Sequence, residues 1–277
     1  MYNFDLVEKE DLRPIDDLLF NLIYQDKAAC QELLRTVFDD DGLIVESVVA
    51  QDTIPNLHGR GVRFDVLCTM SDGSERNVEV QRSNNDDHFR RIRYNGAVIT
   101  AMYTPKGSDF KDITEVYIIY ITEFDPIIKG YMVYHVDSVI RETKDVIDDG
   151  FHRLLINTTV NDGTRLARLM SNFVKKDFAD EEFPELSKQM KYFKHDEEGE
   201  IVMSERMERI YREIREKAEA EGRVEGRVEG RAEGRAETIE ALAALGRTLL
   251  SDNKTDELNK AFSNADYMDA LLKQHNL

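Results

Sequence analysis

Three polar side chains in the first third of the sequence have types and spacing suited to holding a metal ion. Asp65 and Glu79 are separated by thirteen residues, and Gln81 follows Glu79 after one more. Two carboxylates on neighbouring strands offer hard oxygen ligands for Mg²⁺, and such an ion lowers the pKa of a water and polarises a phosphate. This spacing is what a one- or two-ion phosphodiester hydrolase requires, provided that the three side chains share one face.

The apolar alternation around these residues predicts a two-stranded hairpin between Val62 and Gln81. One face is marked as buried by apolar residues at alternate positions: Phe64, Val66, Cys68, Met70, Val78 and Val80. Asp65, Glu79 and Gln81 then share the other face. That face is either a site for chemistry or the solvent side of a half-buried hairpin.

The loop of the hairpin decides whether the two carboxylates meet. A two-residue loop would pair Glu79 with Val66 and mix the faces, because a one-residue slip sends a side chain to the opposite side of a sheet. A three-residue loop over residues 71–73, with Gly73 left-handed, pairs Asp65 directly with Glu79. We predict the three-residue loop, since of the two loops it alone keeps the apolar residues on one face of the hairpin and the polar residues on the other.

Hydrophobic periodicity on either side of the hairpin predicts an α/β domain with the order helix, three strands, helix, strand. The expected helices and strands cover residues 15–23, 30–38, 43–50, 62–70, 75–81, 88–103 and 116–122. Residues 1–125 form the expected core. Residues 126–200 are expected to extend the same domain, with strands at 131–136 and 154–159 and helices after Asp162 and Pro184.

Composition is that of a globular protein, with 277 residues of which 41% are hydrophobic. No run of apolar residues is long enough for a membrane span, and the N-terminus lacks a secretory signal, so we expect a cytoplasmic protein. Cys30 and Cys68 are the only cysteines and are expected to be buried, reduced thiols. The six histidines lack metal-ligand spacing, and His88 alone is near the hairpin in sequence.

The net charge of -18 argues against a protein that coats nucleic acid through bulk electrostatics. Binding of DNA would need a local positive patch. Seven arginines lie close together in sequence around the hairpin: Arg60, Arg63, Arg76, Arg82, Arg90, Arg91 and Arg93. Such a cluster also fits an ordinary solvated surface.

An internal repeat of Glu-Gly-Arg units runs from Glu221 to Glu237 within a charged segment over residues 201–240. As a lone helix it is poor, because each glycine costs about 1 kcal/mol against alanine and the i,i+4 neighbours carry like charges. A second copy of the chain could compensate by pairing Glu stripes with Arg stripes, which predicts a homodimer. A solvated, partly disordered spacer is the equal alternative. Residues 241–277 are expected to form a small helical segment, with a pair of helices predicted over residues 239–250 and 255–272.

The ordered set of motifs resembles the PD-(D/E)XK nuclease superfamily and, within it, the recombination-promoting nuclease and transposase family of bacteria. The resemblance spans most of the chain and rests on these motifs: Asp17-Leu18-Leu19-Phe20, Arg63-Phe64-Asp65-Val66, Asp72-Gly73, Glu79-Val80-Gln81, Arg91-Ile92-Arg93-Tyr94, Tyr117-Ile118-Ile119-Tyr120 and the Glu-Gly-Arg repeats. It implies a restriction-endonuclease-like mixed sheet flanked by helices, an α-β-β-β-α-β core, followed by a long helical C-terminal region.

The resemblance also implies roles for particular residues. Asp65, Glu79 and the carbonyl of Val80 would bind the catalytic Mg²⁺, or Mn²⁺, and Gln81 would complete the catalytic set. The superfamily usually has lysine at this third position, so the neutral Gln81 would orient water by hydrogen bonds. The family pattern also includes Asp17, for which we predict the role of helix N-cap.

The arginines near the hairpin are the expected DNA contacts: Arg63, Arg91 and Arg93. For Arg91 and Arg93 the alternative is surface salt bridging to Asp86 and Asp87. Two functions follow. The first is a Mg²⁺-dependent endodeoxyribonuclease of recombination or transposition type, and the second is a catalytically inactive protein that keeps the nuclease fold and acts as an oligomeric scaffold.

Overall fold

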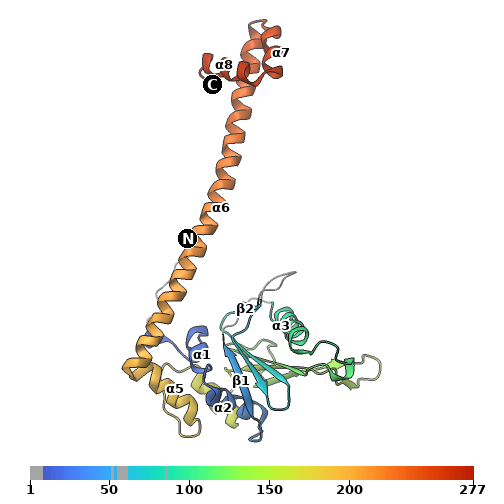
Figure 1. The fold of residues 1–277 in the computed structure, drawn as a ribbon, viewed down its shortest axis with the longest axis vertical. Helices are drawn as coiled ribbons and strands as arrows, with labels where there is room; N and C mark the ends of the chain where they lie inside the picture. The colour runs from blue at the N-terminus through green and yellow to red at the C-terminus, as the bar shows by residue number, and fades with distance from the viewer. Residues whose placement is uncertain (1–8, 51–52, 55–61, 85–86) are drawn as a thin grey trace. The chain divides into compact units, whose positions relative to one another are not determined.

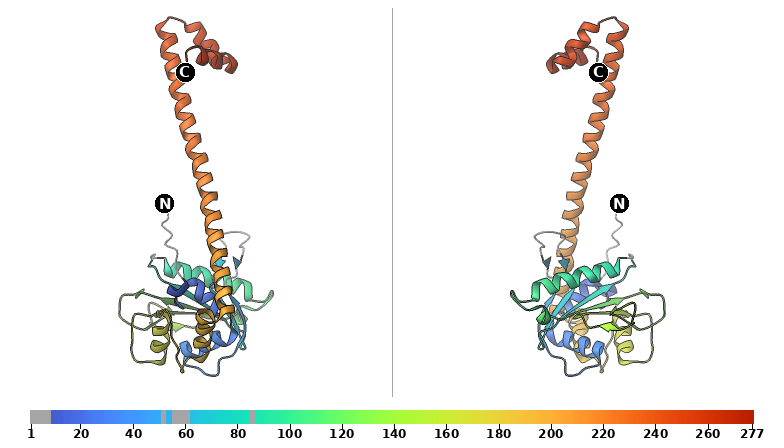
Figure 2. Two further views of the ribbon diagram at one scale, coloured as in Figure 1. Left: turned by 90° about the vertical axis from the view of Figure 1, so that its left-hand side faces the viewer. Right: turned by 90° about the vertical axis from the view of Figure 1, so that its right-hand side faces the viewer.

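The computed structural model describes residues 9–50, 53–54, 62–84 and 87–277. The chain divides into two compact units, Met1–Glu208 and Arg209–Leu277, which are drawn in Figures 1 and 2. The first unit contains the predicted hairpin and is an α/β domain. The second is entirely helical.

The first unit is built on a mixed sheet of six strands in the order β1-β4-β5-β6-β10-β7. β4, β5 and β1 form an antiparallel set, β5, β6 and β10 run parallel, and β7 pairs antiparallel with β10. The strands are β1 (Val45–Ala50), β4 (Val66–Met70), β5 (Glu75–Gln81), β6 (Val116–Thr122), β7 (Val133–Val136) and β10 (Phe151–Asn157). Two short pairs lie outside this sheet: β2 (Thr53–Ile54) with β3 (Val62–Arg63), and β8 (Ser138–Val139) with β9 (Val146–Ile147).

Helices cover both faces of the sheet (Figures 1 and 2). One face packs against α1 (Asp17–Ile23), α2 (Lys27–Phe38), α4 (Arg165–Phe173) and α5 (Pro184–His195) in the larger core. The other face packs against α3 (His88–Tyr103). Short 3-10 helices, η1 (Lys9–Asp11) and η2 (Phe110–Asp112), complete the unit. The expected core order is confirmed by α2, β1, β4, β5, α3 and β6.

Local sequence explains why these helices begin where they do. The Asp26 side chain accepts a hydrogen bond from the backbone N–H of Ala29 at 3.0 Å and so caps α2. Thr164 caps α4 in the same way, and α5 begins with Pro184, whose missing N–H costs nothing at that position. α3 buries one side, which combines apolar, small and polar residues: His88, Ile92, Asn95, Gly96 and Ile99.

The loop of the β4–β5 hairpin has the predicted three residues. The backbone N–H of Met70 donates to the carbonyl of Ser74 at 2.9 Å, and Gly73 has a φ of 84°. Val66 pairs with Val78, so continuing the register places Asp65 opposite Glu79. The prediction of a left-handed glycine that sets this register is confirmed.

The expected strand over residues 62–70 is interrupted, however. Asp65 lies at a bend, and the residues before it pair with β2 instead of β5. Phe64 consequently packs in the α3-side core, whereas Val66 packs on the opposite face. The prediction that Phe64 shares the face of Val66 is therefore wrong, because the bend breaks the strand's alternation.

The face that carries Glu79 is not a solvent face. Glu75, Asn77 and Glu79 alternate along β5 and are all buried on the side that α3 covers. A half-buried hairpin with a wet polar face is thus excluded for β5. A polar row enclosed between a sheet and a helix must be satisfied by specific partners, since burying unpaired polar groups is costly.

Other boundaries shift modestly from the expected ones, while β5, α3 and β6 have the expected bounds. Strand β1 begins at Val45, and β10 covers Phe151–Asn157, three residues earlier at its start than expected. Cys30 and Cys68 are buried free thiols, as predicted. Within the described part of the chain, no helix combines the length and hydropathy needed to cross a membrane.

The second unit contains most of α6 (Glu197–Ser251), followed by α7 (Thr255–Ser263) and α8 (Ala265–Gln274). Its core is formed by the end of α6 packing against α7 and α8 through Leu245, Leu249, Ala261 and Leu271. The expected single helix from Thr255 to Leu272 is divided at Asn264, whose side chain caps α8 by accepting from the backbone N–H of Tyr267. The Glu-Gly-Arg repeat is helical throughout.

Candidate active site

Asp65 directly precedes β4, and the strand register sets it opposite Glu79 on β5. The Asp65 Oδ2 accepts a hydrogen bond from the backbone N–H of Val80 at 3.0 Å. The backbone carbonyl of Gln81 accepts a hydrogen bond from the N–H of Glu123, which follows β6. Successive residues of a strand direct their main-chain N–H and C=O groups to opposite neighbouring strands, so those of Val80 point toward β4. The Asp65 carboxylate, the Glu79 carboxylate and the backbone of Val80 therefore come from one small region of the sheet.

Glu79 is buried and is held by two amide side chains. Asn77 Nδ2 donates to Glu79 Oε1 at 2.8 Å, and Asn95 Nδ2 from α3 donates to the same oxygen at 3.3 Å. Burial, followed by the negative charge of Asp65, raises the pKa of Glu79 above its usual range, while the Asn77 hydrogen bond and Arg91 act in the opposite direction. The influence of Asp65 on this pKa reflects the closeness of the two carboxylates.

Gln81 has both ends of its amide engaged. Its Oε1 accepts from Arg91 Nη1 at 2.9 Å and lies 3.4 Å from the Tyr120 hydroxyl, and its Nε2 donates to the carbonyl of Ser83 at 3.0 Å. These contacts come from α3, β6 and the segment after β5. They fix the orientation of the amide and leave one Nε2 hydrogen without an acceptor in the described part of the chain.

Tyr120 connects Gln81 to His88 in the interior between β6 and α3. A hydrogen bond of 3.0 Å joins the Tyr120 hydroxyl to His88 Nδ1, and another of 2.9 Å joins His88 Nε2 to Asn84 Oδ1. Burial raises the pKa of Tyr120, and Arg91 acts against that shift. His88 is therefore close to the site, as its sequence position indicated, and its ring is committed to positioning contacts.

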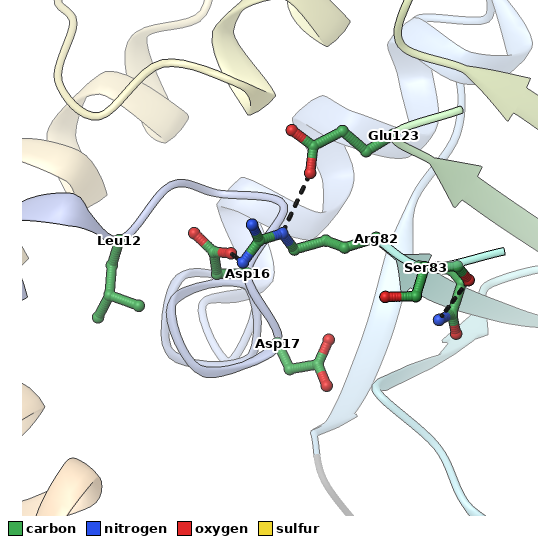
Figure 3. Close-up of a pocket in the computed structure, with 7 residues that line it drawn as sticks. Leu12, Asp16, Asp17, Arg82, Ser83 and Glu123 are labelled. Atoms are coloured by element: carbon green, nitrogen blue, oxygen red, sulfur yellow. Dashed lines mark hydrogen bonds and ion pairs between the residues drawn. The ribbon is translucent and has the colours of Figure 1, made fainter. Parts of the chain in front are cut away.

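A pocket of about 560 Å³ opens beside Gln81 and is lined by Leu12, Asp16, Asp17, Gln81, Arg82, Ser83 and Glu123. Figure 3 shows the Arg82 guanidinium lying between the carboxylates of Asp16 and Glu123. Arg13 also pairs with Glu123 and donates its backbone N–H to Asp16. Three residues that line this pocket, Asp16, Arg82 and Glu123, thus belong to a network of paired charges.

Asp17 contributes to this pocket as the first residue of α1, and it is not the N-cap that we predicted. The N-cap position belongs to Asp16, whose side chain makes no capping hydrogen bond. Instead, Asp16 binds Arg13 and Arg82. The prediction was wrong by one residue, and the carboxylate at the true N-cap position pairs with Arg82, which is distant in sequence and so absent from a local pattern.

The arginines of the predicted positive patch have different environments. Arg76 is buried, with its guanidinium 4.1 Å from the ring centroid of Phe38 and 4.7 Å from that of Tyr117, so it cannot contribute to a surface patch. Arg82 is ion-paired, whereas Arg90 and Arg93 are exposed on α3.

Two of the three arginines predicted to contact DNA, Arg91 and Arg93, have side chains that the structure describes. Arg63 belongs to β3, and its side chain lies outside the described residues, as do Arg60 and Asp86. Arg91 lies 3.8 Å from Asp87, a loose pair between partly exposed groups, and is bound more closely to Gln81. The alternative of a salt bridge therefore applies to Arg91 only weakly.

The donor set has the character that Mg²⁺ prefers in proteins. Within the described ranges no group of three or more His, Cys, Asp or Glu side chains gathers as a metal cage. Two carboxylates with an adjacent backbone carbonyl suit Mg²⁺, which retains waters and commonly takes further ligands from substrate phosphates. The buried Asn77 Oδ1 has no hydrogen-bond partner among the residues that the structure describes, so the polar row on β5 still has an unused acceptor.

Several residues of the site were not found from the sequence: Asn77, Asn95, Tyr120, Asp16 and Glu123. Asn77 could have been found, because it precedes Glu79 by two positions and therefore shares its face. Asn95 lies on the face of α3 that also carries Ile92, so a correct placement of α3 over β5 was the missing information.

This geometry, a mixed sheet between helices with an acidic pair across a hairpin on the central strands, defines a restriction-endonuclease-like fold. The chain belongs to the PD-(D/E)XK nuclease family transposases, whose family model matches residues 14–225. Membership of a nuclease family indicates a hydrolase whose substrate is DNA. No curated protein matches the chain, and neither does any solved structure.

Proposed function

We propose that the protein is a metal-dependent endodeoxyribonuclease of recombination-promoting or transposase type that hydrolyses DNA phosphodiester bonds with Mg²⁺ or Mn²⁺. The observation that supports this is the register that sets Asp65 opposite Glu79 beside the first residue of β4, where the Asp65 carboxylate accepts the backbone N–H of Val80. An acidic pair of this kind, part of it buried, is unfavourable for folding and favourable for holding a cation.

The residues of the site have separate tasks in this proposal. A bound Mg²⁺ would supply Lewis acidity, lowering the pKa of a water and polarising the scissile phosphate. Asp65, Glu79 and the Val80 carbonyl hold the ion. Asn77 and Asn95 fix the Glu79 carboxylate through its Oε1, and Gln81 uses its remaining Nε2 hydrogen to orient water.

Contacts to the DNA backbone are assigned in this proposal to Arg63, Arg91 and Arg93. Arg93 is exposed on α3, the helix that covers the acidic pair. With a net charge of -18 the protein needs such local cations for phosphate contact, and binding should weaken steeply as salt rises.

The test is nicking of supercoiled DNA with Mg²⁺ or Mn²⁺, with and without a chelator. Asp65→Ala and Glu79→Ala should each abolish nicking. The matched control is Glu75→Gln, which changes a buried glutamate on the same face of the same strand, four residues from Glu79, and should retain cleavage. Undiminished nicking by both alanine variants would refute the proposal.

The second candidate is a catalytically inactive scaffold with the nuclease fold. The environment of Gln81 favours this scaffold function, since the amide carries no charge and its oxygen already accepts a hydrogen bond from Arg91. Absence of metal-dependent nicking by the wild-type protein, together with self-association, would support the scaffold.

We propose in addition that the protein forms a homodimer through the repeat. In the chain itself, residues 222–240 are exposed on all sides of α6, and the described Glu and Arg side chains of the repeat make no ion pair there. A second copy can supply opposite charges to both stripes, while the glycines permit close approach of the two helices.

A further inference from the structure

A phosphodiester hydrolase stabilises the negative charge that accumulates near the scissile phosphate in the transition state through bound metal ions and through fixed cationic side chains. Gln81, the third residue of the candidate site, carries no positive charge. A cationic side chain that assists a bound metal ion must then come from elsewhere in the fold, and the described residues place Arg13, Arg82 and Arg91 around Gln81 and its pocket.

Arg82 and Arg13 are already neutralised. Arg82 pairs with Asp16 and, at 3.1 Å, with Glu123, and Arg13 pairs with the same two carboxylates. Two cations and two anions thus form a closed network beside the pocket. Drawing either arginine toward a phosphate would leave a carboxylate uncompensated, which makes both poor candidates.

Arg91 differs because it is directed at the site itself. Its Nη1 donates to Gln81 Oε1 at 2.9 Å, while its carboxylate neighbour Asp87 lies at 3.8 Å and is half exposed. Gln81 follows Glu79 by two positions on β5 and shares its face, so this contact places the guanidinium next to the acidic pair. The guanidinium therefore lies within electrostatic reach of the acidic pair.

The helix α3 gives Arg91 a fixed position. His88 and Ile92 are buried on either side of it in sequence, and Asn95, one turn later, donates to Glu79. The close packing of Gly96 against Phe151 holds the helix on the sheet. A cation on such an element is preorganised, and little rearrangement is needed when charge develops.

We propose that Arg91 is the cation of the active site, supplying from α3 the positive charge that Gln81 does not supply from β5. In this arrangement the hydrogen bond to Gln81 keeps the guanidinium beside the acidic pair. The inference rests on the proposed nuclease function and deepens it, since it makes Arg91 distinct from an arginine that only binds the DNA backbone.

The experiment compares Arg91→Ala, Arg91→Lys and the double variant Arg91→Ala/Gln81→Lys with Arg93→Ala. Arg91→Ala should lower kcat at saturating DNA about 100-fold, as for loss of one preorganised charge-stabilising group. Arg91→Lys should retain part of that activity. The double variant should recover at least 10-fold over Arg91→Ala, since Gln81→Lys restores a positive charge at the site.

Arg93→Ala is the comparison for simple backbone binding, because Arg93 is exposed two residues further along α3. It should raise KM and leave the ratio of kcat values near one. A second readout does not depend on catalysis: DNA affinity at several salt concentrations without divalent cation, measured by fluorescence anisotropy. Each variant should lower the slope of log affinity against log salt by no more than about 0.9, the value for one phosphate contact.

The outcomes separate the possibilities. A wild-type kcat in Arg91→Ala overturns the inference and leaves the nuclease proposal standing. A loss in Arg91→Ala that Gln81→Lys does not recover also overturns it, since Arg91 would then act only by holding Gln81. A wild-type protein that does not cleave DNA overturns the nuclease proposal and this inference together.

Discussion

The Asp65 carboxylate accepts the backbone N–H of Val80 at 3.0 Å and so takes the place of the next ladder bond beyond the end of β4. The side chain that terminates the strand pairing is thus the one assigned to hold the metal. The same contact keeps Asp65 facing Glu79 and fixes which main-chain groups point toward the acidic pair.

Because of this contact, Asp65→Asn is a more informative variant than Asp65→Ala. An asparagine can still accept a hydrogen bond from the Val80 N–H through its side-chain oxygen. The free energy of unfolding of the variant should therefore stay within about 1 kcal/mol of the wild-type value. The negative charge is lost, and cleavage should fall below detection. Thermal unfolding and DNA nicking on the same sample give the two readings, and an active Asp65→Asn variant would contradict the assigned role.

A second prediction concerns the pH dependence of stability, through Glu75. Burial raises the pKa of this glutamate from 4.5 to about 7, against a weak hydrogen bond from Thr69. A carboxyl whose pKa is higher in the folded state contributes stability below the unfolded pKa, and that contribution is lost as pH rises toward the folded value. The loss from this residue should therefore occur between about pH 4.5 and pH 7.

Glu75→Gln removes the ionisation while preserving shape. The variant should match the wild type at pH 4 and exceed it at pH 8 by at least about 1 kcal/mol, since one pKa unit corresponds to about 1.4 kcal/mol. Denaturant titrations at the two pH values measure this difference. Equal stabilities at pH 8 would mean that Glu75 finds compensation beyond its Thr69 contact.

A third prediction tests how α3 is held on the sheet. A Cβ built at Gly96 would lie 2.3 Å from Cε2 of Phe151, so Gly96→Ala forces the ring or the helix to move. We expect destabilisation of about 1–3 kcal/mol, together with reduced cleavage, because α3 carries Arg91 and Asn95. Gly246→Ala is the control, since open space surrounds that helical glycine and alanine there favours the helix.

A double-mutant cycle identifies the cause of the Gly96 effect. Phe151→Ala vacates the space that the new methyl group needs, so its cost should be smaller in the Gly96→Ala background than in the wild type. The coupling should exceed about 0.5 kcal/mol, as for residues in direct contact. Strict additivity would show that Gly96 matters for another reason, such as backbone flexibility.

The hairpin could be predicted from the sequence because its information is local. Alternating apolar residues and one glycine at the loop fix a register, and Asp65 and Glu79 follow from it. The bend at Asp65 was not predicted, since it depends on a side chain taking a main-chain bond. Phe64 then packs on the face opposite to the one its alternation indicated.

The remainder of the site depends on contacts between segments far apart in the chain. Asn95 reaches Glu79 only because α3 packs over β5, and Arg82 reaches Asp16 across 66 positions. Hydrophobic periodicity predicts which side of α3 is buried, but it does not predict which strand that side packs against. The polar partners that complete the site were therefore beyond prediction from one sequence, although Arg91 and Gln81 had been singled out individually.

The last prediction concerns the repeat in α6. Four glycines cost about 4 kcal/mol of helix propensity in total, and the i,i+4 neighbours of each Glu and Arg are like charges. Apart from the neighbouring residues and backbone of α6 itself, no atom of the described residues lies within 4 Å of a Cβ built at Gly222, Gly226, Gly230 or Gly234. A homodimer that pairs the Glu and Arg stripes of two chains would compensate for this penalty, and its association should weaken as salt screens the charges.

The truncation that tests this must follow Glu208. A cut after Glu200 would remove Met203, which is buried in the core of the first unit. Sedimentation should give a dimer for the full chain at low salt, weaker association at high salt, and a monomer for the truncated protein. Replacing the four glycines with alanine should stabilise an isolated helix yet weaken the dimer, because the added methyl groups keep the backbones apart. A full-length monomer at micromolar concentration and low salt would contradict the proposal and leave the repeat as a helical spacer.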